Sequence, residues 1–249
     1  MKNYSNKYIF IYTTILVAVV AILLTAVSVG LKPLQEKNRT VEKIKNILSS
    51  AGYTNIDKNQ IISIFNNVTT ELCIDSKCQV VSSYHDGNFA FGSQRAFNLD
   101  ENKEFYKAFN GDKSFILPVY QVKNESGNNS YVVPVTGKGL WGKIWGYIAI
   151  AADGKTINGT VFLHKSETPG LGGEISSEKF SSSFKGKTIF NDSNKFVSIK
   201  LVKTQSSSDN TEHTVDAISG GTITSEGVQN MMYDCLILYT EFFNNIKEQ

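Results

Sequence analysis

A run of 24 residues without a charged side chain, from Tyr8 to Leu31, constrains this chain more than any other feature of its sequence. As an α-helix the run would extend about 36 Å, whereas the hydrocarbon core of a bilayer is roughly 30 Å thick. Ala26 and Ser28 also fit a cleaved secretory signal, but the run exceeds the usual signal core of about 7–15 residues. We therefore predict an uncleaved, single-pass membrane anchor within residues 1–32.

The charges beside this run do not decide on which side of the membrane the rest of the chain lies. Lysine and arginine are more numerous after the run than before it, which would keep the larger part of the chain in the cytoplasm. Long domains can nevertheless be exported whatever their charge. The residues alone therefore leave both orientations open.

The composition of the chain argues against two classes of protein. A net charge of +2 over 249 residues, with scattered lysines, gives no reason to expect a nucleic-acid partner. Three cysteines are too few for a disulfide framework, and one Cys-x4-Cys pair is a weak metal signal, so we assign no metal site. Cys73 and Cys78 could close a small disulfide loop or remain ordinary thiols, whereas Cys235 falls on an apolar helical face.

Periodicity beyond the anchor predicts a connector followed by strands. The segment TVEKIKNILSSAGY has helical spacing and stops at Gly52, which makes residues 33–60 an amphipathic helical connector. β-Branched residues dominate 61–84 and predict strands joined by turns. The segments SFILPVYQV and SYVVPV predict further strands whose prolines mark sheet edges or strand ends.

The clearest supersecondary signal is a hairpin in GKIWGYIAIAADGKTINGTVFLHK, where two alternating apolar runs flank Asp153-Gly154. NLDENKEFYKAFNGD predicts a short helix, and KFVSIKLVKT predicts a strand before the polar stretch QSSSDNTEHT. The last segment, SEGVQNMMYDCLILYTEFFNNIKE, predicts an amphipathic helix packed on a sheet. Together these elements predict an α+β domain over residues 61–249.

The loop before the last helix, DAISGGTITSEG at 216–227, is rich in glycine and hydroxyl side chains. Thr224 or Ser225 is the predicted N-cap, and the free amides and dipole of a helix start suit a phosphate. An ordinary capped loop without a ligand is the alternative, and the residues alone favour it. No Walker-type lysine follows, and the glycines do not match a dinucleotide fingerprint.

A resemblance changes this interpretation, because DAISGGTITS is similar to the flavinylation motif Asp-x-x-Ser/Thr-Gly-Ala-Ser/Thr-x-Thr. In proteins with that motif, a flavin transferase joins FMN through its phosphate to the last threonine. The resemblance therefore implies covalent FMN on Thr224, with Ser219 and Thr222 donating to the phosphate and Asp216 orienting the loop or serving a metal ion during attachment. Gly221 departs from the motif, where alanine is usual. The matching positions are Asp216, Ser219, Gly220, Thr222 and Thr224.

Two further segments, GKGLWGKIWGYIAI and HKSETPGLGGEI, resemble parts of the C-subunit of the sodium-translocating NADH:quinone oxidoreductase. The resemblance covers the anchor and roughly Thr136 to the end. It implies a single-pass protein of the inner membrane with an extracytoplasmic (periplasmic) FMN-binding domain. Trp141 would stack on the flavin or fill the core. Without this resemblance, Glu167 would be interpreted as a solvated carboxylate in a turn. The implied flavin-lining residues are Glu167, Thr168, Leu171 and Gly172.

The resemblance implies a function without giving the chain a catalytic residue of its own. Its FMN would relay electrons within a complex whose other subunits oxidise NADH, reduce ubiquinone or another quinone and export sodium. The expected partners are those subunits, the flavin transferase and membrane lipid. The equivalent FMN subunit of the Rnf complex, which couples ferredoxin and NAD, carries the same flavin motif and is the nearest alternative. A membrane-anchored, extracytoplasmic ligand-binding module without a redox role is the third.

Overall fold

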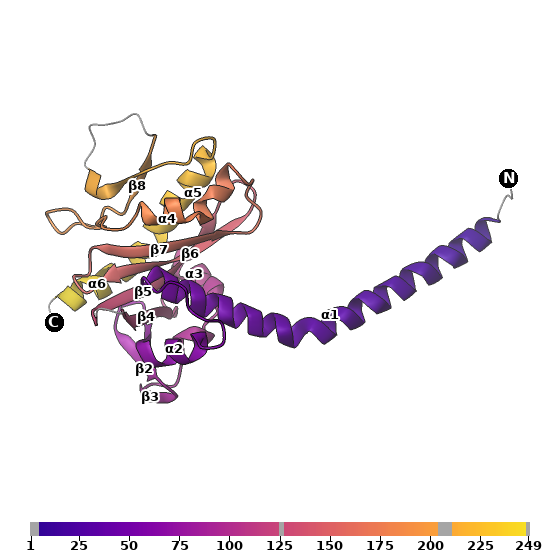
Figure 1. Cartoon of the computed structure of the whole chain (residues 1–249), viewed down its shortest axis with the longest axis horizontal. Helices are drawn as coiled ribbons and strands as arrows, with labels where there is room; N and C mark the ends of the chain where they lie inside the picture. The colour runs from indigo at the N-terminus through magenta and orange to yellow at the C-terminus, as the bar shows by residue number, and fades with distance from the viewer. Residues whose placement is uncertain (1–4, 125–126, 204–210, 248–249) are drawn as a thin grey trace. The chain divides into compact units, whose positions relative to one another are not determined.

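The computed structural model describes residues 5–124, 127–203 and 211–247 of the chain, which divides into two compact units, residues 1–43 and 44–249. Helix α1 (Asn6–Ser50) is the one helix among the described residues that is long and apolar enough to cross a membrane (Figure 1). The predicted span and the start of the predicted connector form this single helix, with Pro33 inside it. Residues 51–60 are turns and loop, so the helical connector is shorter than predicted.

The second unit begins at Ile44, earlier than the predicted domain start, because the last turns of α1 bury apolar side chains. Its main sheet has seven antiparallel strands in the order β3-β2-β1-β4-β5-β6-β7. Two short strands, β8 (Lys200–Val202) and β9 (Thr214–Asp216), pair in parallel as a separate sheet. The main strands are β1 (Thr69–Ile74), β2 (Val80–His85), β3 (Asn88–Phe91), β4 (Leu117–Lys123), β5 (Asn129–Lys138), β6 (Lys143–Ala151) and β7 (Ile157–His164).

Five further α-helices complete the described part of this unit, and its α+β class confirms the predicted fold. The prediction of strands from residue 61 onward was wrong for residues 61–68, which form helix α2. Ile61 and Phe65, one helical turn apart, are buried side by side, and this packing outweighs the strand preference of the β-branched residues. The five helices are α2 (Ile61–Val68), α3 (Glu101–Phe109), α4 (Glu178–Ser182), α5 (Thr222–Leu236) and α6 (Thr240–Lys247).

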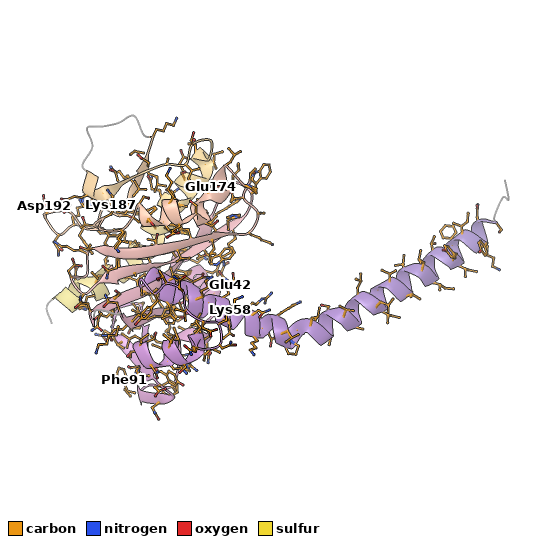
Figure 2. The ribbon with its side chains drawn as sticks, viewed as in Figure 1. Glu42, Lys58, Phe91, Glu174, Lys187 and Asp192 are labelled. Carbon is orange, nitrogen blue, oxygen red and sulfur yellow. The ribbon has the colours of Figure 1, made fainter. Side chains whose placement is uncertain are left out.

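Successive side chains of a strand point to opposite faces, so the sheet has two packed surfaces. The main core lies on one face, where Val133, Val135 and Ile148 pack with α3, α5 and α6. On the other face, Phe65 of α2 packs against the ring of Tyr120, with centroids 6.3 Å apart. The outer strand β3 exposes all of its side chains, including Phe91 (Figure 2).

The predicted hairpin at Asp153-Gly154 is confirmed as β6 and β7. Gly154 has the positive φ of +66° that the turn requires, and Asp153 accepts hydrogen bonds from the amides of Lys155 and Thr156. The predicted strands with prolines are also confirmed as β4 and β5, but both are interior strands. The β4–β5 pairing covers only Tyr120–Lys123 and Asn129–Val132. Pro118 and Pro134 therefore lie outside the paired part of these two strands.

The last helical segment is divided into α5, a 3-10 turn (Ile237–Tyr239) and α6, and its predicted apolar face is buried. The predicted strand in KFVSIKLVKT is reduced to β8, and residues 204–210 of the following polar stretch lie outside the described residues. Cys73 and Cys78 are buried free thiols bonded to different carbonyls, those of Gln94 and Leu238. The buried residues of the last segment are Val228, Met231, Met232, Cys235, Leu236, Tyr239, Phe242 and Phe243.

Candidate functional site

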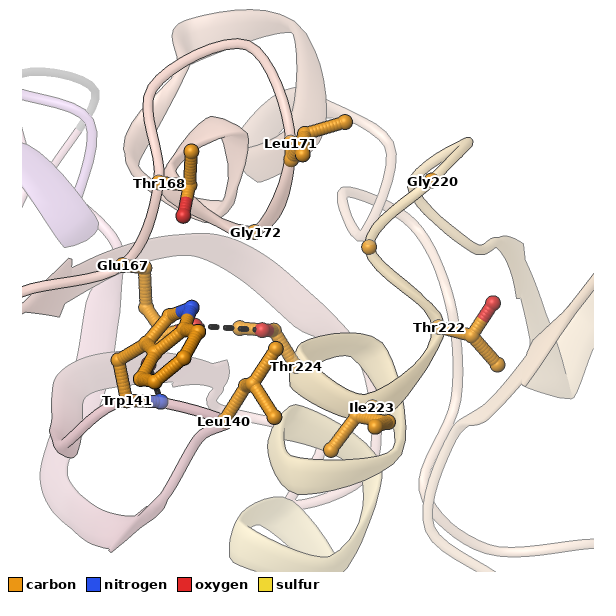
Figure 3. Close-up of a pocket in the computed structure, with 11 residues that line it drawn as sticks. Leu140, Trp141, Glu167, Thr168, Leu171, Gly172, Gly220, Thr222, Ile223 and Thr224 are labelled. Atoms are coloured by element: carbon orange, nitrogen blue, oxygen red, sulfur yellow. Dashed lines mark hydrogen bonds between the residues drawn. The ribbon is translucent and has the colours of Figure 1, made fainter.

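A cavity of about 370 Å³ lies where three segments distant in sequence meet (Figure 3). One is the turn between β5 and β6, the second is the loop after β7, and the third is the start of α5. The β6–β7 pairing carries the first two segments to the same end of the sheet, and α5 packs against β5. The lining residues are Leu140, Trp141, Glu167, Thr168, Leu171, Gly172, Gly220, Gly221, Thr222, Ile223 and Thr224.

The centre of the site is a hydrogen bond between two buried side chains. Oγ1 of Thr224 donates to Oε2 of Glu167 over 2.6 Å, and the two residues are 1% and 4% exposed (Figure 3). The structure therefore brings together two of the predicted site residues that lie 57 positions apart. A burial this complete contradicts the alternative in which Glu167 is a solvated turn carboxylate.

Backbone amides hold the other oxygen of Glu167. Oε1 accepts from the amide of Trp141 over 2.8 Å and from that of Gly142 over 3.2 Å. Burial raises the pKa of this carboxyl, but the hydrogen bonds from Thr224 and from the turn amides outweigh it and lower the pKa below its usual value. Glu167 is therefore a carboxylate at neutral pH.

His164 shapes the loop that delivers Glu167, although nothing in the sequence assigned it a role. The amide of Glu167 donates to Nδ1 of His164 over 3.1 Å. The hydroxyl of Ser166 donates to the carbonyl of Trp141 over 3.2 Å. This bond joins the loop after β7 to the turn between β5 and β6. The spacing His-x-x-Glu within a turn was the only sequence signal for this contact.

Glycines allow the three segments to approach this closely. A Cβ atom on Gly172 would lie 2.4 Å from Oγ1 of Thr224 and 2.8 Å from Oε2 of Glu167. A Cβ atom on Gly139 would lie 2.6 Å from Oε1 of Glu167. Gly137, Gly139, Gly142 and Gly146 are all tightly packed, because a Cβ atom on each would lie less than 3.0 Å from a neighbouring atom.

The start of α5 differs from the predicted cap. Gly221 is the N-cap, whereas Thr224 and Ser225 lie inside the first turn and are buried, so the predicted capping roles were wrong. Oγ of Ser225 instead accepts from the amide of Ile218 over 3.0 Å and fastens the preceding loop. Gly220 has a φ of +72°, which reverses the chain immediately before the helix.

This reversal separates the remaining motif residues into two groups. Thr222 lines the same cavity as Thr224. Residues two positions apart in a helix point in directions about 200° apart around its axis, so Thr222 is exposed while Thr224 is buried. Asp216 and Ser219 are also exposed and line a second cavity of about 500 Å³ instead. Within the described part of the chain, no group of three or more histidine, cysteine, aspartate or glutamate side chains could hold a metal ion.

The rim of the first cavity is apolar and open to solvent. Trp141 is 66% exposed, which excludes the core position left open for it, whereas Trp145 is half-buried on β6. The free amides at the start of α5 place an anion-compatible group beside this apolar rim, whereas the ionised Glu167 at the same end would repel an anion. The other exposed apolar residues that line the cavity are Leu140, Leu171 and Ile223.

Comparisons with known proteins agree with this geometry. The model of the FMN-binding domain family matches residues 139–237, which include the whole lining of the first cavity. The chain is 31% identical over 235 residues to the C-subunit of the Na(+)-translocating NADH-quinone reductase of Vibrio anguillarum, covering 92% of this chain and 89% of that protein.

Solved structures give the same result. The crystal structure of the corresponding C-subunit from Parabacteroides distasonis superposes with a TM-score of 0.71 at 34% identity, over 86% of this chain and 96% of that one. The NqrC structure from Shewanella oneidensis superposes with a TM-score of 0.69 at 29% identity, over 85% and 99% of the two chains. This protein belongs to the NqrC family, the C-subunits of the Na+-translocating NADH-quinone reductase.

Proposed function

We propose that this protein is the FMN-carrying electron-transfer subunit of a membrane-bound Na+-translocating NADH:quinone oxidoreductase, with FMN joined through its phosphate to Thr224. The observation that carries the proposal is the position of the Thr224 hydroxyl in the wall of a cavity within the matched FMN-binding region. The family assignment favours this function over the Rnf alternative and over a ligand-binding module without redox chemistry.

The residues of the cavity fit a covalently held flavin mononucleotide. Exposed apolar side chains, above all Trp141 and Leu171, offer surfaces against which a flat ring system can pack. The first amides of α5 and its dipole favour the phosphate that would follow Thr224. Gly172 leaves room for the Thr224–Glu167 pair and Gly220 leaves room for Leu171, so these lining side chains can keep their positions.

Six of the lining residues then have a role toward the cofactor. Thr224 forms the ester and Trp141 stacks on the flavin, while Thr168, Leu171 and Gly172 contact its ring system. The amides of α5 bind the phosphate, and Thr222 adds a contact at the cavity rim that attachment does not require. Ser219 and Asp216 lie toward the second cavity, so for them we favour contact with the flavin transferase over contact with FMN.

The FMN held here would accept and pass on electrons between neighbouring redox centres. The chain's own contribution is to bind the cofactor permanently, orient it and keep one edge open to partners, for which the exposed rim is suited. NADH oxidation, quinone reduction and sodium transport would belong to other subunits of the complex. Helix α1 would anchor the subunit in the lipid bilayer with residues 44–249 on the periplasmic side.

Flavin fluorescence on a denaturing gel tests the proposal, because only a covalent flavin survives denaturation. The full chain is produced together with a flavin transferase, as wild type, Thr224→Val and Thr222→Val. Fluorescent bands for wild type and Thr222→Val, and no band for Thr224→Val, are expected. A fluorescent Thr224→Val band would refute the attachment site, and no band for any of the three would refute covalent FMN. Protease accessibility in intact spheroplasts tests the proposed orientation separately.

A further inference from the structure

The Thr224–Glu167 hydrogen bond joins a nucleophile and a base within the cavity. A threonine hydroxyl attacks poorly until a base takes its proton. A general base must lie within about 2.6–3.2 Å of the atom that gives up the proton. Oε2 of Glu167 lies 2.6 Å from Oγ1 of Thr224 and is the acceptor of that hydrogen bond. The geometry therefore meets the requirement for direct proton transfer.

The surroundings of Glu167 aim one oxygen at Thr224. The amides of Trp141 and Gly142 occupy Oε1, which leaves Oε2 for the hydroxyl. Among the described residues, no lysine or arginine side chain forms an ion pair with Glu167. Gly172 and Gly139 pack against the pair so tightly that a methyl group at either position would displace it.

Loss of the hydrogen bond from Thr224 during the reaction would favour proton transfer from the hydroxyl to Glu167. It is one of the contacts that keep the pKa of Glu167 low, whereas burial acts to raise that pKa. Once the threonine oxygen becomes an ester it has no proton to donate, so this contact is lost while the burial remains. The carboxylate therefore becomes a stronger base as the reaction proceeds.

We propose that Glu167 is the general base that activates Thr224 for its own modification by FMN. This inference rests on the proposed function, because it gives a catalytic role to a residue of the attachment site. It adds that the chain supplies part of the chemistry of its own flavinylation, while the transferase supplies and activates the donor.

The step balances with a flavin dinucleotide as the donor, in which a pyrophosphate joins FMN to a nucleoside monophosphate. Oγ1 of Thr224 attacks the phosphorus of the FMN half, and a new oxygen–phosphorus bond forms. The phosphorus–oxygen bond of the pyrophosphate breaks, and the nucleoside monophosphate leaves with the electron pair. The hydroxyl proton passes to Oε2 of Glu167, where it also removes the repulsion between this carboxylate and the new phosphodiester anion. Nothing is oxidised or reduced.

Single-turnover attachment kinetics test this role. The cofactor-free full chain in detergent is mixed with excess flavin transferase and with FAD as the flavin dinucleotide donor. Attached FMN is then followed by in-gel fluorescence and by the intact mass of the protein. Glu167→Gln keeps the size of the side chain and its carbonyl acceptor for the turn amides, but it cannot take a proton. We expect attachment to slow about 100-fold or more, the usual contribution of a general base. Glu241→Gln makes the same change at an exposed position on α6, away from the residues that line the cavity, and it should react at the wild-type rate.

Melting temperatures of the cofactor-free variants separate chemistry from folding. A Glu167→Gln protein that melts close to wild type but reacts about 100-fold more slowly supports the proposal, and one that reacts within threefold of wild type overturns it. If Glu167→Gln does not fold, Glu167→Asp replaces it, because aspartate keeps the charge but withdraws it by one methylene. A slowed Glu167→Asp supports the proposal, and a wild-type rate overturns it. Failure of wild type itself to acquire FMN would instead refute the proposed function.

Discussion

Glu71 and Glu167 are both buried carboxylates of the same unit, 3% and 4% exposed, yet they are stabilised in different ways. Glu71 on β1 forms an ion pair with Arg95 and accepts from the amide of Phe97 over 2.9 Å. Glu167 has backbone amides and the hydroxyl of Thr224 as its donors. The charge of Glu71 is neutralised by a guanidinium group that does not give up its proton. The carboxylate of Glu167 instead faces a hydroxyl whose proton it can accept. The difference indicates that the first residue serves folding and the second serves chemistry.

Removal of Arg95 should have the largest effect on stability. Arg95→Met would leave Glu71 as a buried, unpaired charge, and we expect the free energy of unfolding to fall by about 2–4 kcal/mol. This loss is smaller than the usual maximum for a buried ion pair because the Arg95 side chain is 29% exposed. Urea unfolding of the full chain in detergent measures this loss. Arg95→Lys keeps a charge and should recover part of it. Covalent FMN per folded molecule should not change, and a parallel loss of FMN would break the proposed division of roles.

Loss of the Thr224 hydroxyl should have an intermediate, pH-dependent effect on the cofactor-free protein. Thr224→Val leaves Oε2 of Glu167 without its side-chain donor, which should cost about 1–3 kcal/mol at pH 7. Because the folded state holds the pKa of Glu167 below its ordinary value of 4.5, the stabilisation is present above that value and is lost as pH falls through the lower, folded-state pKa.

The difference between wild type and Thr224→Val should therefore shrink under acid conditions. Urea unfolding at pH 7 and at pH values below 4.5 measures it. Thr222→Val, at an exposed position of the same turn, is the control and should change stability by less than about 0.5 kcal/mol. A cost for Thr224→Val that does not depend on pH would contradict the idea that the hydroxyl stabilises an ionised Glu167.

Crowding at the glycines should have effects no larger than that of Thr224→Val, and it distinguishes two neighbouring positions. Gly172→Ala places a methyl group 2.4 Å from Oγ1 of Thr224, which should cost about 1–3 kcal/mol and reduce FMN attachment. Gly221→Ala has an ordinary φ of −114° and a nearest contact of 3.0 Å, so we expect a change within about 1 kcal/mol and normal attachment. Melting curves and in-gel fluorescence check both. Equal losses at the two positions would show that the Thr224–Glu167 contact has no special sensitivity.

The sequence predicted those parts of the fold that depend on local periodicity. The β6–β7 hairpin and the apolar face of the last helical segment follow patterns that persist over many residues, so they could be read directly. Helix α2 was missed because Ile61 and its β-branched neighbours favour strands locally, while burial of Phe65 against Tyr120 is a tertiary effect.

Eight of the eleven residues that line the cavity were among the predicted site residues, whereas the predicted Asp216 and Ser219 line another cavity and the arrangement was not predicted. The motif identified Thr224, yet its burial beside Glu167 depends on a turn at Gly139–Gly142 that brings backbone amides to the carboxylate. The positive φ of Gly220 turns Ser219 away from Thr224, although the two residues belong to one motif. No spacing rule in the sequence encodes either the turn or the reversal.

Peptide mapping gives the strongest test of covalent FMN on Thr224. The full chain is produced together with a flavin transferase and digested, and the fragments containing residues 216–227 are analysed by tandem mass spectrometry. The account predicts one FMN joined through its phosphate to Thr224, and an unmodified Thr222 in the same peptide. A chain that carries no FMN in this peptide, or carries it on any residue other than Thr224, would contradict the account.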